Sequence, residues 1–272
     1  MPSNSRQPQA LQTVLSEWPL WGISGTRTPE IITQFRQGRS NDSYLLKIDT
    51  EHYVLRMRRV NHGQTQNTRY ENLIQHGAAQ LGLAPRVVYQ SPNLGYRLCS
   101  YARGTTLAHN TWLDAQDLSH LCNSIMQYQQ LTVALPDFSY TQLLEQYWQQ
   151  AQSAINTGQK AELTARYTKL HKACIEYEQC SGGVRSLCHH DLNAHNIVRC
   201  EPTSTTGPVF MLLDWEFAGN GIASMDFAAL SVELHISIDT LAPIVNISNC
   251  ELATAADIYR LMCELYNIAS SV

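Results

Sequence analysis

Two acidic residues and an asparagine form the most informative pattern in this sequence. Asp191 and Asn196 stand five positions apart, and Asp214 follows a short apolar run at 209–213. Transfer of a phosphoryl group to an alcohol requires a carboxylate beside the hydroxyl group and oxygen ligands that hold Mg²⁺ against the phosphates. Asp191 is suited to the first task, and Asn196 and Asp214 are suited to the second. The pattern therefore favours a Mg²⁺-dependent phosphoryl transfer.

The histidines around Asp191 allow another interpretation, a zinc site. His189, His190 and His195 lie close together along the chain and follow Cys188. Adjacent residues of an extended segment point to opposite faces, which is a poor geometry for joint ligation. No further Cys or His stands at a matching short spacing. We therefore expect His189 to brace the loop around Asp191 and His195 to be an ordinary loop residue.

Composition limits the class of protein. The chain has 272 residues, of which 44% are hydrophobic and 15% charged, so it can bury a sizeable core and is not disordered. No apolar run is long enough to span a bilayer, and the polar start at 1–10 does not resemble a secretory signal. The net charge of −4 disfavours nucleic acid as a partner. We expect a cytoplasmic protein with no membrane or nucleic-acid partner, and its oligomeric state is left open.

The first third of the chain has a β-rich pattern. Apolar runs at 44–48 and 53–57, joined by a polar stretch, predict a hairpin. A helix is predicted over 68–81 with Leu73, Ile74 and Gly77 on one face, followed by strands over 86–90 and 96–101.

Helical spacing dominates after Gly104. It predicts helices over 118–128, 140–154, 161–179, 224–238 and 249–268, with short strands at 187–189 and 209–213. We therefore expect an α+β fold with an N-terminal nucleotide-binding lobe over 1–102 and a C-terminal catalytic and substrate lobe over 103–272.

The order of these motifs resembles that of the aminoglycoside phosphotransferase and choline kinase superfamily. The motifs are the loop from His189 to Asn196, the strand that ends in Asp214-Trp215-Glu216, and the later Asp226. The resemblance extends from about Phe35 to Phe227 and implies a bilobal protein-kinase-like fold, with a small β-rich N-lobe and a larger helical C-lobe. It also implies ATP and Mg²⁺ as cofactors.

The resemblance implies a distinct role for each motif residue of the C-terminal lobe. Asp191 accepts the proton of the alcohol, and His189 belongs with it to the catalytic loop. Asn196 and Asp214 resemble the metal ligands, and Asp226 resembles the acid that braces the loop.

The resemblance also implies a nucleotide site. The segment 35–43 is similar to the phosphate-covering loop, with Gly38, Ser40 and Asn41 as candidate contacts. Arg56 is similar to the phosphate-contacting cation, Glu71 to the acid that positions it, and Ser100-Tyr101 to the hinge that meets adenine. The chain departs from the pattern in four ways. The loop has one glycine, the cation is Arg rather than Lys, His190 occupies the second position of the catalytic loop, and a longer insertion at 200–208 separates the two motifs.

Within the superfamily, the segments 143–150 and 214–219 are most similar to bacterial thiamine kinases, and choline kinases share the second segment. Thiamine and choline are small cations with a primary hydroxyl group. A cation over an aromatic face gains about 0.5–2 kcal/mol, so Tyr147, Trp148, Trp215 and Glu216 are candidate substrate contacts. Residues such as Tyr147 and Trp148 are more often packing residues than ligand contacts, and a packing role is also open for Trp215. Glu216 can bind the metal, bind the substrate or lie at the surface.

The acceptor alcohol is predicted in order of preference. Thiamine comes first, choline or ethanolamine second, and an aminoglycoside third, because many amines call for a more acidic site. The alternative from another class is a non-catalytic pseudokinase that binds a nucleotide. The intact Asp191, Asn196 and Asp214 argue against that alternative.

Overall fold

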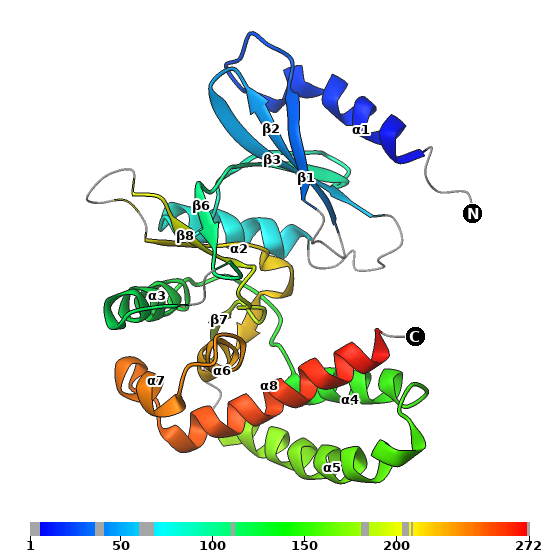
Figure 1. Ribbon diagram of the computed structural model, residues 1–272, viewed down its shortest axis with the longest axis vertical. Coiled ribbons are helices and arrows are strands. Elements are labelled where there is room, and N and C mark those ends of the chain that lie inside the picture. The colour runs from blue at the N-terminus through cyan, green and yellow to red at the C-terminus, as the bar shows by residue number, and fades with distance from the viewer. Residues whose placement is uncertain are drawn as a thin grey trace. The chain divides into compact units, whose positions relative to one another are not determined.

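A computed structural model describes residues 6–35, 41–59, 68–109, 112–180, 185–202, 207 and 209–270. The chain divides into two compact units, Met1–Arg103 and Gly104–Val272. The first is built around an antiparallel sheet and the second is mainly helical, so the α+β prediction is confirmed (Figure 1). None of the helices in the described ranges is both apolar enough and long enough to cross a membrane.

The N-terminal unit contains a five-stranded antiparallel sheet with the order β1-β2-β3-β5-β4. Its strands are β1 (Glu30–Phe35), β2 (Asn41–Ile48), β3 (Glu51–Arg58), β4 (Val87–Gln90) and β5 (Tyr96–Ser100). Its helices are α1 (Arg6–Ser16), the 3₁₀ turn η1 (Trp18–Trp21) and α2 (Thr68–Gln80). The predicted hairpin is confirmed as β2 and β3, which pair in continuous register.

One face of this sheet packs against α1. Leu46, Leu55 and Leu98 have no solvent exposure and form one cluster with Leu11 and Val14 of α1. These leucines alternate along their strands with residues of the opposite face, as the pleat of a sheet requires. That opposite face therefore holds the side chains between them, among which are Arg56 of β3 and Arg97 of β5.

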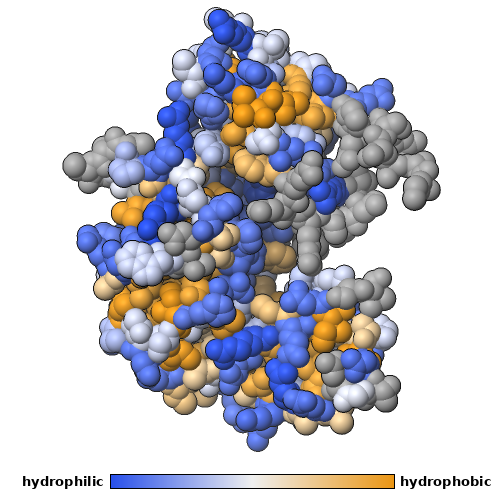
Figure 2. Space-filling view, viewed as in Figure 1, coloured by the Kyte–Doolittle hydropathy of each residue, from blue (hydrophilic) through white to orange (hydrophobic). Residues whose placement is uncertain are grey.

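The edge strand β1 is exposed along its whole length. Its apolar side chains Ile31, Ile32 and Phe35 are between 38% and 46% exposed. Figure 2 shows apolar surface on the N-terminal unit and also on the C-terminal unit.

Helix α2 buries a different set of residues from the one predicted. Leu73 is 59% exposed, whereas Ile74 and Ala78 are buried together with the polar residues Glu71 and Gln75. Gln75 is satisfied because its amide donates to the carbonyl of Pro85 at 2.8 Å. The buried face of α2 is thus partly polar, and the placement of Leu73 on that face was wrong.

The C-terminal unit combines two small sheets with a set of helices. Its helices are α3 (Ala115–Tyr128), α4 (Tyr140–Ala151), α5 (Thr157–Cys180), η2 (Trp215–Phe217), α6 (Ser224–Glu233), α7 (Ile238–Val245) and α8 (Asn249–Ala269). Its strands are β6 (Gly104–Thr106), β7 (Ser186–Cys188), β8 (Ile197–Cys200), β9 (Phe210–Leu212) and β10 (Gly219–Gly221). The sheets have the orders β6-β8-β9 and β10-β7.

Helix α6 is the centre of this unit. Every residue from Ser224 to Ser231 is buried, which is the pattern of a helix surrounded by protein. It packs against the long helix α8, which also contacts α4 and α5 (Figure 1).

The prediction of one helix over 224–238 was wrong. The chain leaves α6 at Leu234, and His235 adopts a left-handed backbone with φ of 55°. Ser231 holds the turn, because its hydroxyl donates to the carbonyl of Ile236 at 2.7 Å. Ser237 then precedes α7 in an extended conformation. The apolar spacing continues across the break, so it did not reveal the turn.

Gly104 should be irreplaceable at the start of β6. Its φ is +152°, and a Cβ atom there would lie 2.1 Å from the carbonyl oxygen of Arg199 on β8. We expect Gly104→Ala to lower the free energy of unfolding by about 1–3 kcal/mol, because backbone cannot move aside as a side chain can. Denaturant unfolding would measure the loss.

The matched control is Gly158→Ala in the first turn of α5. The nearest atom to a Cβ there is Asn156 Oδ1 at 3.6 Å, an ordinary contact. This variant should be as stable as the parent or slightly more stable. Equal stability of the two alanine variants would contradict the role given to Gly104.

Candidate active site

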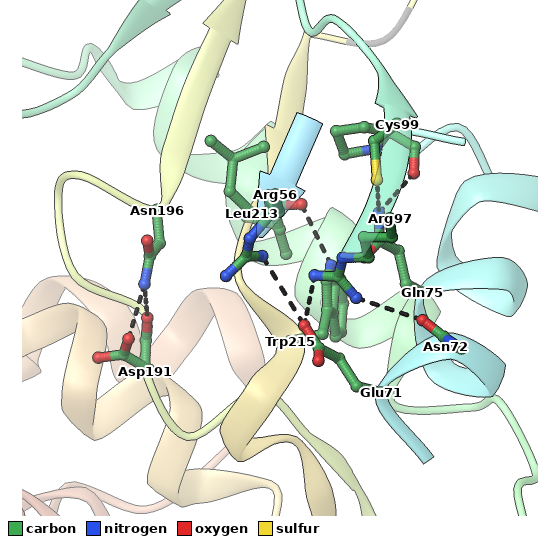
Figure 3. A network of polar contacts seen from close by, with 12 residues as sticks. Arg56, Glu71, Asn72, Gln75, Arg97, Cys99, Asp191, Asn196, Leu213 and Trp215 are labelled. Atoms are coloured by element: carbon green, nitrogen blue, oxygen red, sulfur yellow. Dashed lines mark hydrogen bonds and ion pairs between the residues drawn. The ribbon is translucent and has the colours of Figure 1, made fainter. Parts of the chain in front are cut away.

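The loop between β7 and β8 holds the side chains of Asp191 and Asn196 together. The amide of Asn196 donates to Asp191 Oδ2 at 2.7 Å and to the carbonyl of Asp191 at 2.9 Å (Figure 3). Asn193 donates to the other carboxylate oxygen, Oδ1, at 2.9 Å. The Asp191 carboxylate is therefore fixed by two amides, and the second of them, Asn193, was not predicted from the sequence. The only signal for Asn193 is its place in a tight turn of small polar residues.

His189 connects this loop to the segment that carries Asp214. Its Nδ1 accepts from the backbone N–H of Asp191 at 3.3 Å, which makes Nε2 the protonated nitrogen. Nε2 lies 2.9 Å from the carbonyl oxygen of Leu213, the residue before Asp214, and donates to it. The histidine thus ties together the backbones at both acids, which is the bracing role predicted for it.

The two acids are close enough to influence each other. Burial raises the pKa of Asp191, and the charge of Asp214 raises it further. His189 and the hydrogen bonds from Asn193 and Asn196 act in the opposite direction. Asp214 itself has a left-handed backbone with φ of 64°, at the start of η2. The structure therefore brings Asp191, Asn196 and Asp214 into one local site of the C-terminal unit.

This donor set suits Mg²⁺. The amide nitrogen of Asn196 is directed at Asp191, so its oxygen is turned away from that residue. Carboxylate and amide oxygens are the ligands that Mg²⁺ prefers, and two protein ligands are typical where phosphates supply the rest. In the described residues, no group of three or more His, Cys, Asp or Glu could hold a metal ion.

The carboxylate of Asp226 holds the backbone of the loop through hydrogen bonds. It lies in the first turn of α6 without solvent exposure and accepts from the backbone N–H groups of His189 at 2.9 Å and His190 at 3.0 Å. The hydroxyl group of Tyr128 also donates to it, at 2.6 Å. Charge-assisted hydrogen bonds of this kind are about twice as strong as neutral ones. The loop is thereby attached to the most buried helix of the unit.

His190 fills the position where the sequence departs from the family pattern. Its backbone is left-handed with φ of 64°, and its ring stacks on Phe138 at a centroid distance of 4.0 Å. Nδ1 donates to the carbonyl of Phe217 at 3.0 Å, so Nε2 accepts from the hydroxyl of Tyr140 at 2.9 Å. A Cβ at Gly221 would lie 2.5 Å from Nε2, so this glycine leaves room for the ring. His190 therefore connects the loop between β7 and β8 to η2 and α4.

The predicted nucleotide residues are only partly described. Gly38 and Ser40 lie outside the described residues, and Asn41 is the first residue of β2. Arg56 Nη1 lies 3.7 Å from the carboxylate of Glu71, at ion-pair distance. The carboxylate of Glu71 also forms a shorter contact with Arg97 of β5, a residue that was not predicted (Figure 3).

Ser100 is the last residue of β5, and Tyr101 follows it. The backbone N–H of Ser100 donates to Arg86 and that of Tyr101 to His52, at 2.8 and 3.2 Å. These two amides are engaged within the N-terminal unit. A hinge contact with adenine, as predicted here, would therefore use other backbone groups or compete with these bonds.

The predicted substrate residues fall into different environments. Trp215 is fully buried, lies edge-on to Tyr128 and donates to the carbonyl of Leu212 at 3.2 Å. This favours a packing role for Trp215 over substrate contact. Trp148 stacks on Tyr167 with centroids 4.4 Å apart, and Glu216 is half-buried in η2.

The charge of Asp191 acts on an acid and two tyrosines. Burial raises the pKa of Tyr147 to about 12, with Asp191 among the further causes. Burial and then the Asp191 charge also raise the pKa of Glu233, and the same charge acts on Tyr259. The Tyr259 hydroxyl donates to Glu233 at 3.2 Å. We call Tyr147, Glu233 and Tyr259 the acceptor-side cluster; its last two members were not predicted as contacts.

His190 gives the unit a measurable pH dependence. Burial lowers the pKa of His190, so the folded chain takes up its proton less readily than the unfolded chain, whose histidines titrate at about 6.5. Stability therefore falls as the pH falls below about 6.5. We expect the difference in Tm between the parent and His190→Asn to shrink from pH 7 to pH 5.

The control for this comparison is His235→Asn. His235 also has a left-handed backbone, which asparagine tolerates, but it is exposed. Its pH dependence should match that of the parent. A constant or growing difference for His190→Asn would contradict the burial effect.

Known proteins with similar sequences are phosphotransferases. The model of the phosphotransferase enzyme family, APH, matches residues 31–244. Thiamine kinase of Salmonella paratyphi A is 27% identical over 245 residues, which are 86% of this chain and 75% of that protein. Thiamine kinase of Salmonella typhimurium is also 27% identical, over 244 residues with the same coverage.

Solved structures agree in fold. The choline kinase LicA of Streptococcus pneumoniae has a TM-score of 0.71 at 14% identity and covers 96% of this chain and 91% of its own. The GDP complex of aminoglycoside 2′-phosphotransferase-IIIa has a TM-score of 0.64 at 14% identity, with coverage of 95% and 89%. The predicted superfamily and kinase-like fold are thereby confirmed. Since the family model spans most of the chain, this protein belongs to the phosphotransferase enzyme family and is a small-molecule kinase that uses a nucleoside triphosphate.

Proposed function

We propose that this kinase transfers the γ-phosphate of ATP to the primary hydroxyl group of a small cationic alcohol, with thiamine as the first candidate. The observation that carries the proposal is the gathering of Asp191, Asn196 and Asp214 around one loop braced by His189. The similarity to thiamine kinases supports the choice of alcohol. Choline and ethanolamine are the second candidates, because the fold is shared with choline kinases.

Each residue at the loop has a defined task in this proposal. Asp191 orients the hydroxyl group and accepts its proton, and Asn193 and Asn196 keep the carboxylate in position. Asn196 and Asp214 would hold Mg²⁺ through oxygen atoms. Bound Mg²⁺ would offset the negative charge of the phosphates, and catalysis otherwise consists of positioning and electrostatics.

The nucleotide tasks belong to the N-terminal unit. Arg56 contacts the phosphates, with Glu71 as its ion-pair partner. Gly38, Ser40 and Asn41 cover the phosphates, and Ser100-Tyr101 lies at adenine. These roles follow the family resemblance and are proposals for this chain.

The acceptor-side cluster supports a cationic substrate. Glu233 offers a carboxylate, and the rings of Tyr147 and Tyr259 offer aromatic faces near the charge of Asp191. Of the originally predicted contacts, we retain Tyr147, Trp148 and Glu216. A positive group on the substrate would reduce the repulsion between Glu233 and Asp191 that raises the pKa of Glu233.

Asp191→Asn should separate chemistry from nucleotide binding. We expect kcat to fall by about 10²–10⁴-fold, because general-base catalysis contributes that much, while the Kd for ATP changes little. Transfer of label from [γ-³²P]ATP to thiamine, choline, ethanolamine and an aminoglycoside would measure it. Asp257→Asn, which alters an exposed ion pair with Arg260, is the control. Turnover of Asp191→Asn at the parental rate would overturn the role, and ATP binding without transfer to any alcohol would favour a non-catalytic protein.

Glu233→Gln should identify the acceptor side. Loss of a charged contact typically costs about 1.5–3 kcal/mol, so we expect the KM for the cationic alcohol to rise about tenfold or more while the KM for ATP is unchanged. Steady-state kinetics with both substrates varied would show the difference. The control is Glu264→Gln. Glu264 lies on α8, and this change removes a carboxylate that is paired with Arg166 of α5. An unchanged KM for the alcohol would exclude Glu233 from recognition.

A further inference from the structure

Two arginines face each other on adjacent strands of the N-terminal sheet. Arg56 of β3 and Arg97 of β5 are direct partners in the antiparallel register. Directly opposed side chains lie on the same face of a sheet, and like charges in such a pair repel each other. A group of opposite charge is needed to hold both guanidinium groups at this place.

Glu71 of α2 is that group. Its Oε1 accepts a short hydrogen bond from Arg97 Nη2, and the same oxygen lies 3.7 Å from Arg56 Nη1 (Figure 3). Arg97 Nη1 also donates to Oδ1 of the next residue, Asn72, at 3.3 Å. One carboxylate thus serves two arginines, and the direct hydrogen bond goes to Arg97.

The charged side chains of Arg56, Glu71 and Arg97 are largely buried. The side chains of Arg97 and Glu71 are 6% and 8% exposed, and that of Arg56 is 14% exposed. Both guanidinium groups share the carboxylate of Glu71 in a poorly solvated place. A phosphate group beside Arg56 would add a further negative charge there.

We propose that Arg97 is a positioning residue for nucleotide binding: it anchors Glu71 and Asn72 of α2 and thereby sets where Arg56 meets the phosphates. The inference rests on the phosphate role of Arg56 in the proposed function. Arg97 touches no phosphate in this scheme. Its effect reaches the nucleotide through Glu71 and therefore through Arg56.

The test measures nucleotide binding directly and so needs no acceptor alcohol. The Kd of the full chain for the non-hydrolysable analogue AMP-PNP with Mg²⁺ is determined by isothermal titration calorimetry. The variants are Arg56→Met, Arg97→Met and the double variant. We expect each single variant to weaken binding about tenfold or more, because a charge-assisted contact is lost.

The double variant distinguishes positioning from a merely structural role. If Arg97 acts through Arg56, the double variant binds about as weakly as Arg56→Met alone, because the two effects share one path. A general loss of stability lowers the Tm of Arg97→Met but leaves the Kd of the folded fraction unchanged. Multiplying effects, or an unchanged Kd for Arg97→Met, would overturn the inference.

Arg97→Lys keeps the proposal testable should Arg97→Met fail to fold. Lysine keeps the charge but lacks the planar fork that reaches Glu71 and Asn72 together, so binding should weaken to an intermediate degree. A parental Kd for Arg97→Lys, with Arg97→Met unfolded, would count against positioning. Arg166→Met, which breaks the ion pair with Glu264, is the control and should bind AMP-PNP as the parent does.

Failure of this inference can be told from failure of the proposed function. If Arg56→Met binds AMP-PNP like the parent, the phosphate role of Arg56 is wrong. If Arg56→Met binds weakly but both Arg97 variants bind normally, only the positioning role of Arg97 is wrong.

Discussion

The loop at 189–196 of this kinase depends on one buried carboxylate. Asp226 accepts the backbone N–H groups of His189 and His190 and the hydroxyl group of Tyr128, so the loop, α3 and α6 meet at a single charge. A buried carboxylate is tolerated only when its oxygens are well supplied with donors, and here they are. This anchor holds the backbone of the loop rather than its side chains. Asp191 gains its fixed place from this attachment.

The side chains of His189 and His190 connect the loop to two different segments. His189 joins the backbones at Asp191 and Leu213, so the acid that follows Leu213 stays beside the loop. The ring of His190 forms hydrogen bonds with the carbonyl group of Phe217 and the hydroxyl group of Tyr140. One histidine therefore sets the separation of the two acids, and the other sets the place of the segment after them. The hydrogen bonds of each imidazole define which of its ring nitrogens faces which partner.

Sequence reasoning found the residues whose chemistry has a recognisable order along the chain, and it missed those that depend on contacts between distant elements. Asp191, Asn196 and Asp214 belong to the first group. Arg97 belongs to the second, because only the register of β3 and β5 places it opposite Arg56. The pair of Glu233 and Tyr259 likewise forms across the packing of α6 and α8. On α2 the search for apolar residues selected Leu73, whereas the buried face includes polar Glu71, since its partner is a buried arginine.

The burial of α6 on all sides has a consequence for how this loop can move. Asp226 has no solvent exposure, and the amide hydrogens of His189 and His190 are bonded to its carboxylate. Their exchange with deuterium therefore requires α6 to separate from its neighbours, an event close in free energy to unfolding of the whole unit. These two amides would report the global stability of the C-terminal unit from within its catalytic loop.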